Sequence, residues 1–307
     1  MRPRIFSLAL AGAVFLAACS GSPDSVDAGE SLLRFFPPQT SAVAFVDFGG
    51  LEDHAFVGSF IEEHAGVQTP DELADFQAGT GFDFERDVRQ VMAGSAGEGG
   101  GLIVVNAVYD RERVIRYVTD EGMAYADHGG TGLFLPDAST DTVFAFVDDV
   151  VLIGTEPHVR GAIDRAGGGV PSALDNARLL EDIAEIEDGY QIWATGSIDT
   201  GLIPEEAGES GITLVLASLE RGTYQMRFDE TITARAIGEF TSADQARTAA
   251  SLLEGLRGMA MIQGVAGEFY DLLSGILIAT NDTQVEIQLQ LERAVLERLA
   301  ESGALSR

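Results

Sequence analysis

The chain of 307 residues contains one cysteine and no lysine. A single cysteine excludes a disulfide within the chain, so the fold depends on burial of apolar side chains. The absence of lysine excludes Schiff-base catalysis, a Ser-Lys nucleophile and the lysine of a nucleotide-binding P-loop. Long hydrophobic runs are also missing after the N-terminus. The best candidates, residues 101–109 and 142–155, are too short or are interrupted by charge for a helix that spans a bilayer.

Charge of one sign dominates the chain. After residue 18 it carries 17 arginines and 49 acidic residues, so the net charge is 17 − 49 = −32 over 289 residues. Such a surface repels phosphate backbones and anionic head groups, which argues against nucleic acid and against direct docking on lipid. Dispersed carboxylates that keep the protein in solution explain the excess best, and cationic ligands stay open as partners. Apolar residues make up 46% of the chain, enough for one or two packed cores.

The N-terminus has the layout of an export signal. Arg2 and Arg4 precede an apolar stretch, residues 5–16, and small residues at 17–18 lead to Cys19. This pattern resembles the lipobox of bacterial lipoproteins. The resemblance implies cleavage before Cys19, a diacylglyceryl thioether on its sulfur, and N-acylation, typically with palmitate. The alternative is an ordinary secretory signal with an incidental cysteine, but an unpaired exported thiol would be a liability.

Residues 1–18 are therefore expected to be a lipoprotein signal peptide, and residues 19–31 an acidic flexible tether. Such a tether has a mean reach on the order of 20 Å. Two or three acyl chains on Cys19 would hold the protein firmly on a membrane. Ser20 follows Cys19, whereas aspartate there is the usual inner-membrane retention signal of Gram-negative lipoproteins. The resemblance thus favours the outer membrane in a Gram-negative host.

A β-hairpin followed by a helix is predicted at the end of the first half. Strands at residues 142–147 and 150–155 flank Asp148 and Asp149, a two-residue turn, and a helix follows from Glu156. Both strands are rich in β-branched and aromatic residues, as is typical of buried strands.

The same order returns near the C-terminus. Strands at residues 276–280 and 284–291 flank Asn281 and Asp282, and a helix over residues 292–301 follows. Apolar and polar residues alternate in the second strand, which indicates that one face of the sheet is exposed to solvent. The repetition favours two related units.

Upstream segments extend the correspondence between the halves. The strand at residues 190–198 matches the strand at 42–48, and the helix capped by Ser242 matches the helix capped by Asp110. Three consecutive glycines end the first half at residues 167–169. The sequence thus predicts an α+β fold of antiparallel sheets with helices on one side, in two related repeat units, residues 32–170 and 171–307.

No catalytic motif is recognisable. Ser95, Ser197 and Ser210 lack the flanking glycines of a nucleophile elbow. The histidines lack the spacing of a zinc-binding pair. The sequence therefore predicts no catalytic residue, no cofactor and no metal ligand. The four histidines are His54, His64, His128 and His158.

Two segments match ligand-binding loops in part. Residues 83–87 carry alternating carboxylates like a calcium loop, but Val88 and Gly94 stand where that loop needs glycine and glutamate. A turn and a short helix are expected there. The glycine-rich residues 97–101 enter a strand and do not open a helix, so a hairpin loop is favoured over a phosphate cradle.

Trp193 is the lone tryptophan, and it lies within an apolar segment, residues 190–194. A large aromatic side chain in a strand is most often part of the core. Stacking on a ligand would require this side chain to be exposed on a concave face.

The start of the body, Pro37-Pro38 followed by the strand at residues 42–47, and the Gly-Phe-Asp-x-x-x-Asp element at 81–87 resemble uncharacterised envelope lipoproteins and secreted proteins of bacteria. That resemblance implies no activity. The favoured hypothesis is a lipid-anchored cell-envelope protein, not an enzyme, that binds an envelope protein or a small ligand through its sheet or between its halves. The alternative is an envelope hydrolase that uses Asp or Glu carboxylates, with or without a divalent metal.

Overall fold

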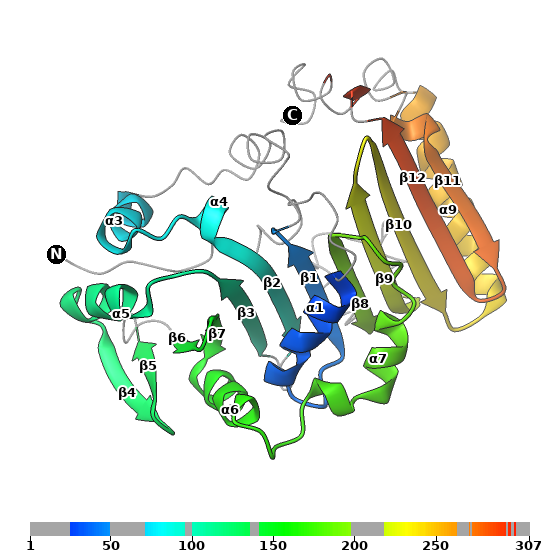
Figure 1. The fold of residues 1–307 in the computed structure, drawn as a ribbon. Helices are drawn as coiled ribbons and strands as arrows, with labels where there is room; N and C mark the ends of the chain where they lie inside the picture. The colour runs from blue at the N-terminus through cyan, green and yellow to red at the C-terminus, as the bar shows by residue number, and fades with distance from the viewer. Residues whose placement is uncertain are drawn as a thin grey trace. The chain divides into compact units, whose positions relative to one another are not determined.

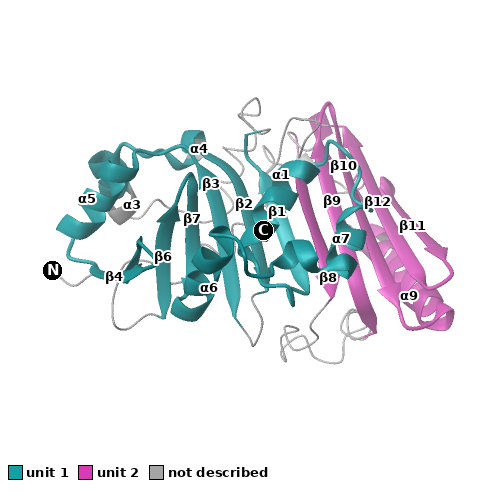
Figure 2. Ribbon diagram, turned by 60° about the horizontal axis from the view of Figure 1, so that its bottom comes forward, with its two compact units in different colours: residues 1–191 teal, residues 192–307 magenta. Residues whose placement is uncertain are grey.

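The chain forms two compact units, Met1–Gln191 and Ile192–Arg307, shown in a computed structural model (Figures 1 and 2). The sequence-based boundary stands earlier, at residue 170. Helices and antiparallel strands make up both units, which confirms the α+β class. The structure describes residues 25–49, 71–95, 100–135, 141–197, 218–262 and 272–292, together with residues 270, 294, 295 and 298.

Unit 1 is an antiparallel sheet with helices packed on it. Its described strands lie in the order β1-β2-β3-β7-β6-β5-β4. The strands are β1 (Ala42–Asp47), β2 (Val88–Ser95), β3 (Gly101–Ala107), β4 (Ala124–His128), β5 (Thr131–Leu135), β6 (Thr142–Val147) and β7 (Val150–Thr155). The helices are α1 (Ser25–Leu32), η2 (Leu33–Phe35), α3 (Asp71–Thr80), α4 (Phe84–Asp87), α5 (Arg111–Asp120), α6 (Glu156–Ala166), η3 (Ala173–Asp175) and α7 (Ala177–Ile183).

The helix boundaries of unit 1 follow local signals in the sequence. The side chain of Asp110 accepts a hydrogen bond from the backbone N–H of Arg113 at 3.0 Å and caps α5, as predicted. Gly122, with φ of +79°, ends this helix. Helix α6 begins where expected, with Pro157 in its first turn. The cap predicted at Thr69 and the helix predicted around residues 56–61 lie outside the described residues.

Part of the segment predicted as a tether is helical, and residues 19–24 lie outside the described residues. Residues 25–32 form helix α1, although their small and acidic side chains favoured a flexible segment. Val26, Gly29 and Leu32 recur every three residues, and this side of the helix is buried or half-buried. Gly29 and Leu32 are buried, so packing on the body overrides the low helix propensity of the sequence.

Helices cover both faces of the unit 1 sheet, whereas one side was predicted. Helix α5 packs Val114 and Val118 against Phe134 and Phe146. Helix α6 lies on the opposite face, because it bonds to His128, whose side chain alternates with that of Asp127 on β4. The prediction was wrong for this unit because strand β6 is apolar on both faces.

Unit 2 contains five described strands in the order β8-β9-β10-β12-β11. Helix α9 (Ala243–Ile262) packs Ala246 and Ala249 against Phe240 and Val285. On the opposite face, β12 carries Glu286, Gln288 and Gln290, as the alternation in the last strand predicted. The strands are β8 (Ile192–Ser197), β9 (Leu219–Phe228), β10 (Thr231–Phe240), β11 (Ile276–Asn281) and β12 (Gln284–Glu292).

The hairpin turns are placed almost as expected. Asp148 and Asp149 form the two-residue turn between β6 and β7, which confirms the prediction. In the last hairpin the turn is one residue later than predicted. Asn281 still pairs with Gln284, and Asp282 is the first turn residue, with φ of +53°. The helix predicted over residues 292–301 lies mostly outside the described residues.

Candidate binding face and polar networks

One face of the unit 1 sheet carries a continuous row of apolar side chains. Cross-strand pairs connect Ala44 to Ala93, Ala93 to Ile103, and Ile103 to Ile153. From there the row continues through β6 and β5 to β4. Paired residues point to the same side of a sheet, so these side chains share one face. A second row on this face contains Val46, Val91, Val105, Val151 and Phe146.

In the part of unit 1 that the structure describes, α5 covers one end of this face, and the central part is incompletely covered. We call it the apolar face and define it as Ala44, Val91, Ala93, Ile103, Val105 and Ile153, all of which are half-buried. On the other side of the same strands, Phe45, Met92 and Leu152 are 0% exposed. An antiparallel sheet that faces water on one side normally alternates apolar and polar residues. The apolar face lies beside the part of the sheet that α5 covers, and it lacks this alternation.

His128, at the end of β4, bonds to two residues of α6. Its Nε2 lies 2.8 Å from Oδ1 of Asp164, and its Nδ1 lies 2.9 Å from Nη1 of Arg160. Arginine can only donate, so Nδ1 accepts and the ring donates to Asp164 through Nε2. Nε and Nη2 of Arg160 also donate to Oε1 of Glu156, at 2.8 and 2.7 Å.

This network joins β4 to α6 and offers little to catalysis. A general base needs a lone pair that faces the proton to be removed. The Nδ1 lone pair of His128 is directed at Arg160, and the Nε2 hydrogen at Asp164. The network therefore holds the edge strand β4 against helix α6.

A second histidine lies near the start of the same helix. Oγ1 of Thr155 is 2.7 Å from Nδ1 of His158, and the imidazole packs so closely against Gly100 that a Cβ added there would overlap Cε1 of the ring. A hydroxyl hydrogen-bonded to an imidazole is a nucleophile–base pair, which in a catalytic triad is completed by a carboxylate that orients the imidazole. Among the described contacts no carboxylate orients the other ring nitrogen of His158, so the arrangement has no triad.

The Gly-Phe-Asp-x-x-x-Asp element is a capped turn of helix, as the sequence predicted. Asp87 accepts the backbone N–H of Asp83 at 2.8 Å, and Asp83 accepts that of Arg86 at 3.3 Å. Arg86 donates to both oxygens of Asp87 at 2.7 Å. This hydrogen-bonded arginine lowers the pKa of Asp87 below its usual range. The carboxylates close the turn, which explains their spacing without a metal ion.

Glu286, on the face of unit 2 opposite α9, is a second carboxyl group with a shifted pKa. Gln288 and Arg235 both bond to Oε1 of Glu286, at 2.7 and 2.5 Å. These bonds, that of Gln288 first, lower the pKa of Glu286. A carboxylic acid that protonates a glycosidic oxygen needs a raised pKa. The pKa values of Asp87 and Glu286 are lowered, so neither carboxyl group suits that role. In the described ranges, no group of three metal-ligating side chains occurs.

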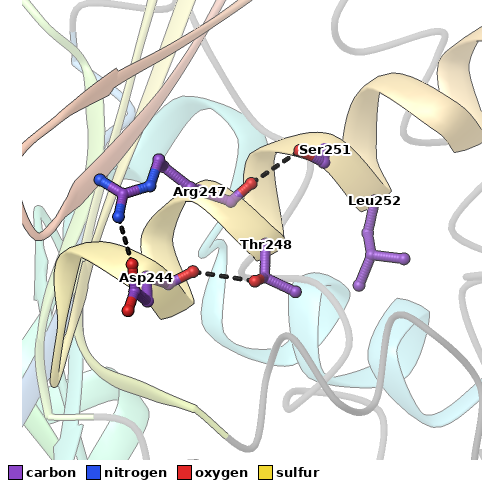
Figure 3. Close-up of a pocket in the computed structure, with 5 residues that line it drawn as sticks. All are labelled: Asp244, Arg247, Thr248, Ser251 and Leu252. Carbon is purple, nitrogen blue, oxygen red and sulfur yellow. Dashed lines mark hydrogen bonds and ion pairs between the residues drawn. The ribbon is translucent and has the colours of Figure 1, made fainter.

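A shallow hollow on α9 also lacks converging chemistry (Figure 3). Its polar groups satisfy one another, since Arg247 bonds to Asp244 and Thr248 donates to the Asp244 carbonyl. Ser251 likewise donates to the Arg247 carbonyl. Every lining residue belongs to one side of one helix. The hollow is therefore ordinary helix surface.

The structure places some predicted residues and leaves others undescribed. Trp193 is fully buried, which confirms its assignment to the core. Ser95 ends β2, where its hydroxyl accepts the backbone N–H of Ser41. Cys19 lies outside the described residues, as do His54, His64 and Ser210. The sequence did not predict the apolar face, although apolar and polar residues fail to alternate in β3 and β6.

No family model, no curated protein and no solved structure matches the chain. Among the helices of the described parts, none is long and apolar enough to cross a membrane.

Proposed function

We propose that this protein is a cell-envelope lipoprotein, anchored through acyl chains on Cys19, that binds a partner protein through the apolar face of unit 1. The anchor rests on the lipobox pattern, and Ser20 favours the outer membrane in a Gram-negative host. The observation that carries the binding role is the half-buried apolar row from Ala44 to Ile153. No contact among the described residues favours the hydrolase.

The charge of the chain indicates the kind of partner. A net charge of −30 attracts cationic surfaces and repels anionic ones. The apolar face spans β1, β2, β3 and β7, so its occupant needs an apolar stripe flanked by positive charge. An amphipathic helix with a basic polar side has both properties. We take such a helix of an envelope protein as the occupant.

Binding of a synthetic amphipathic helix made of leucine and lysine tests this proposal. The full chain should bind this peptide and should not bind the matched peptide of leucine and glutamate. Ile103→Asp places a charge on the apolar face and should weaken binding by at least about tenfold. Thr248→Asp adds the same charge to an exposed side of α9 and is the matched control.

The two aspartate variants separate the alternatives. If charge alone attracts the peptide, both variants bind it at least as tightly as the original chain, and the proposal fails. If neither peptide binds, the proposal also fails. Ile103→Thr keeps a β-branched side chain and serves as a second variant if Ile103→Asp unfolds. Thermal unfolding of each variant checks that the fold persists.

We also propose that the two units are related repeats. The strand order β1-β2-β3-β7-β6 of unit 1 matches β8-β9-β10-β12-β11 of unit 2. In both units a helix, α5 or α9, follows the third strand, and the last two strands form a hairpin with a two-residue turn. Unit 1 differs by the inserted hairpin β4–β5. Experimental structures in which the five equivalent strands fail to superpose would contradict this relationship.

A further inference from the structure

We infer that the outer edge of β11 pairs, antiparallel, with β11 of a second copy of this chain. This contact would form whether or not the chain is anchored by lipid or binds a partner through the apolar face of unit 1. Within the described residues, β11 ends the strand order of unit 2. Figures 1 and 2 both show β11 as the outermost strand of its sheet.

The hydrogen-bond pattern of the last hairpin identifies the outward backbone groups. In a two-residue hairpin the closing pair is hydrogen-bonded, and such pairs alternate along the ladder. Asn281 pairs with Gln284, so the N–H and C=O of Asn281, Ala279 and Leu277 point to β12. Those of Ile276, Ile278 and Thr280 point away from it. Arg257 donates to the outward carbonyl of Ile276, which agrees with this assignment.

In unit 1 the strand equivalent to β11 is paired with a further antiparallel strand. Counted back from the turn, Ile278 of β11 is the equivalent of Phe144 of β6. The outward side of Phe144 pairs antiparallel with Phe134 of β5. Unit 2 has no described equivalent of the β4–β5 hairpin. The edge that β5 covers in unit 1 is therefore presented by β11 in unit 2.

The sequence of β11 also lacks the usual protection against pairing, and Arg257 occupies only one of the two lone pairs of the Ile276 carbonyl. Natural edge strands carry charges, prolines or bulges that block the approach of another strand. The sequence of β11 is Ile-Leu-Ile-Ala-Thr-Asn, and its six pairs with β12 run without a bulge. Leu277 is 62% exposed. By contrast β4, the edge of unit 1, carries Asp127 and His128, and His128 is tied to α6.

A second copy fits this edge in one register. A two-fold axis at Ile278 pairs this residue with itself and pairs Ile276 with Thr280, which joins outward N–H groups to outward carbonyls. Leu277 then lies opposite Ala279 of the other copy. No charged residue faces a like charge in these pairs, although each chain carries a net charge of −30. This absence of charge favours self-pairing over a charged partner strand.

Disulfide trapping tests both the contact and its register. Leu277 and Ala279 of the other copy form a pair without direct hydrogen bonds, with Cα atoms about 4.5 Å apart, which a disulfide can bridge. The full chain with Leu277→Cys and Ala279→Cys should form a covalent dimer on oxidation. Either single substitution should lower the yield of covalent dimer by at least about fivefold, because each cysteine then lies opposite a residue that has no thiol.

A proline removes the contact without disturbing the monomer. Thr280→Pro in the double-cysteine chain deletes an outward N–H and should lower the yield of covalent dimer by at least about fivefold. Thr280→Ala keeps this N–H and should leave the yield unchanged. An equal thermal midpoint of the two variants shows that the fold is intact. The inference is overturned if the double-cysteine chain stays monomeric, or if Thr280→Pro leaves the yield unchanged.

Discussion

Asp148 and Asp282 hold the same left-handed backbone conformation, with φ of 52° and 53°, at the first turn position of two hairpins. No other described residue except glycine has a positive φ. Each aspartate joins the last two strands of its unit, and each turn sets the register of the strands that follow. The shared backbone supports the proposed repeat, because residue identity between the halves is low.

A β-branched residue at the turn should be poorly tolerated. Asp282→Val is expected to lower the free energy of unfolding by about 1–2 kcal/mol, since its branched Cβ opposes a positive φ. Asp282→Gly should change it by less than about 1 kcal/mol, because relief of strain offsets the added freedom of the unfolded chain. Chemical denaturation measures both. Equal effects of Val and Gly would show that φ at residue 282 is unimportant.

The close approach of His158 to Gly100 predicts a coupled pair. Gly100→Ala should lower the free energy of unfolding by about 1–2 kcal/mol, because its Cβ displaces the imidazole from Thr155. In a chain with His158→Ala the same substitution should cost less than about half as much. A double-mutant cycle by denaturant unfolding measures the coupling. If the effects of the two substitutions on the free energy of unfolding are additive, Gly100 and His158 are not coupled and the prediction is wrong.

The sequence predicted the elements that local chemistry determines. Asp110 as a helix cap, Pro157 at a helix start and Asp148 in a turn each act within a few residues, and all three are confirmed. Helix α1 was missed because Gly29 and Leu32 are ordered by contacts with distant residues, which composition does not report.

The apolar face could have been predicted only in part. The lack of alternation in β3 and β6 indicates strands that are apolar on both sides, but not which strands lie next to them. The row from Ala44 to Ile153 exists because β7 pairs with β3, and this pairing joins residues about fifty positions apart. Register over such distances follows from tertiary packing, which a single sequence does not display.

The capped turn at Asp87 predicts a pH-dependent contribution to stability. Its pKa is lowered by Arg86, so the carboxylate stabilises the fold above the pKa of the unfolded chain, and this contribution is lost as pH falls through the folded pKa. Asp87→Asn should therefore lower the thermal midpoint at pH 7. The difference should shrink as the pH is lowered from 7 to about 2, because the carboxylate of Asp87 becomes protonated.

Arg86→Gln is the companion variant for this test. It removes the side chain that lowers the pKa of Asp87 but keeps the backbone N–H that Asp83 accepts. The variant should lose part of the same pH-dependent stability. A difference between Asp87→Asn and the original chain that is equal at both pH values would assign the role of Asp87 to packing alone.

The anchor makes the most direct prediction. Cys19→Ser removes the sulfur that would carry the diacylglyceryl group, so incorporation of labelled palmitate should fall to background and the protein should leave the membrane fraction. The thermal midpoint should not change, because the described body begins at residue 25. In a Gram-negative expression host, Ser20→Asp should keep acylation and move the protein to the inner membrane. Retention of Cys19→Ser on membranes would show that another surface holds the protein, and a net charge of −30 argues against such a surface.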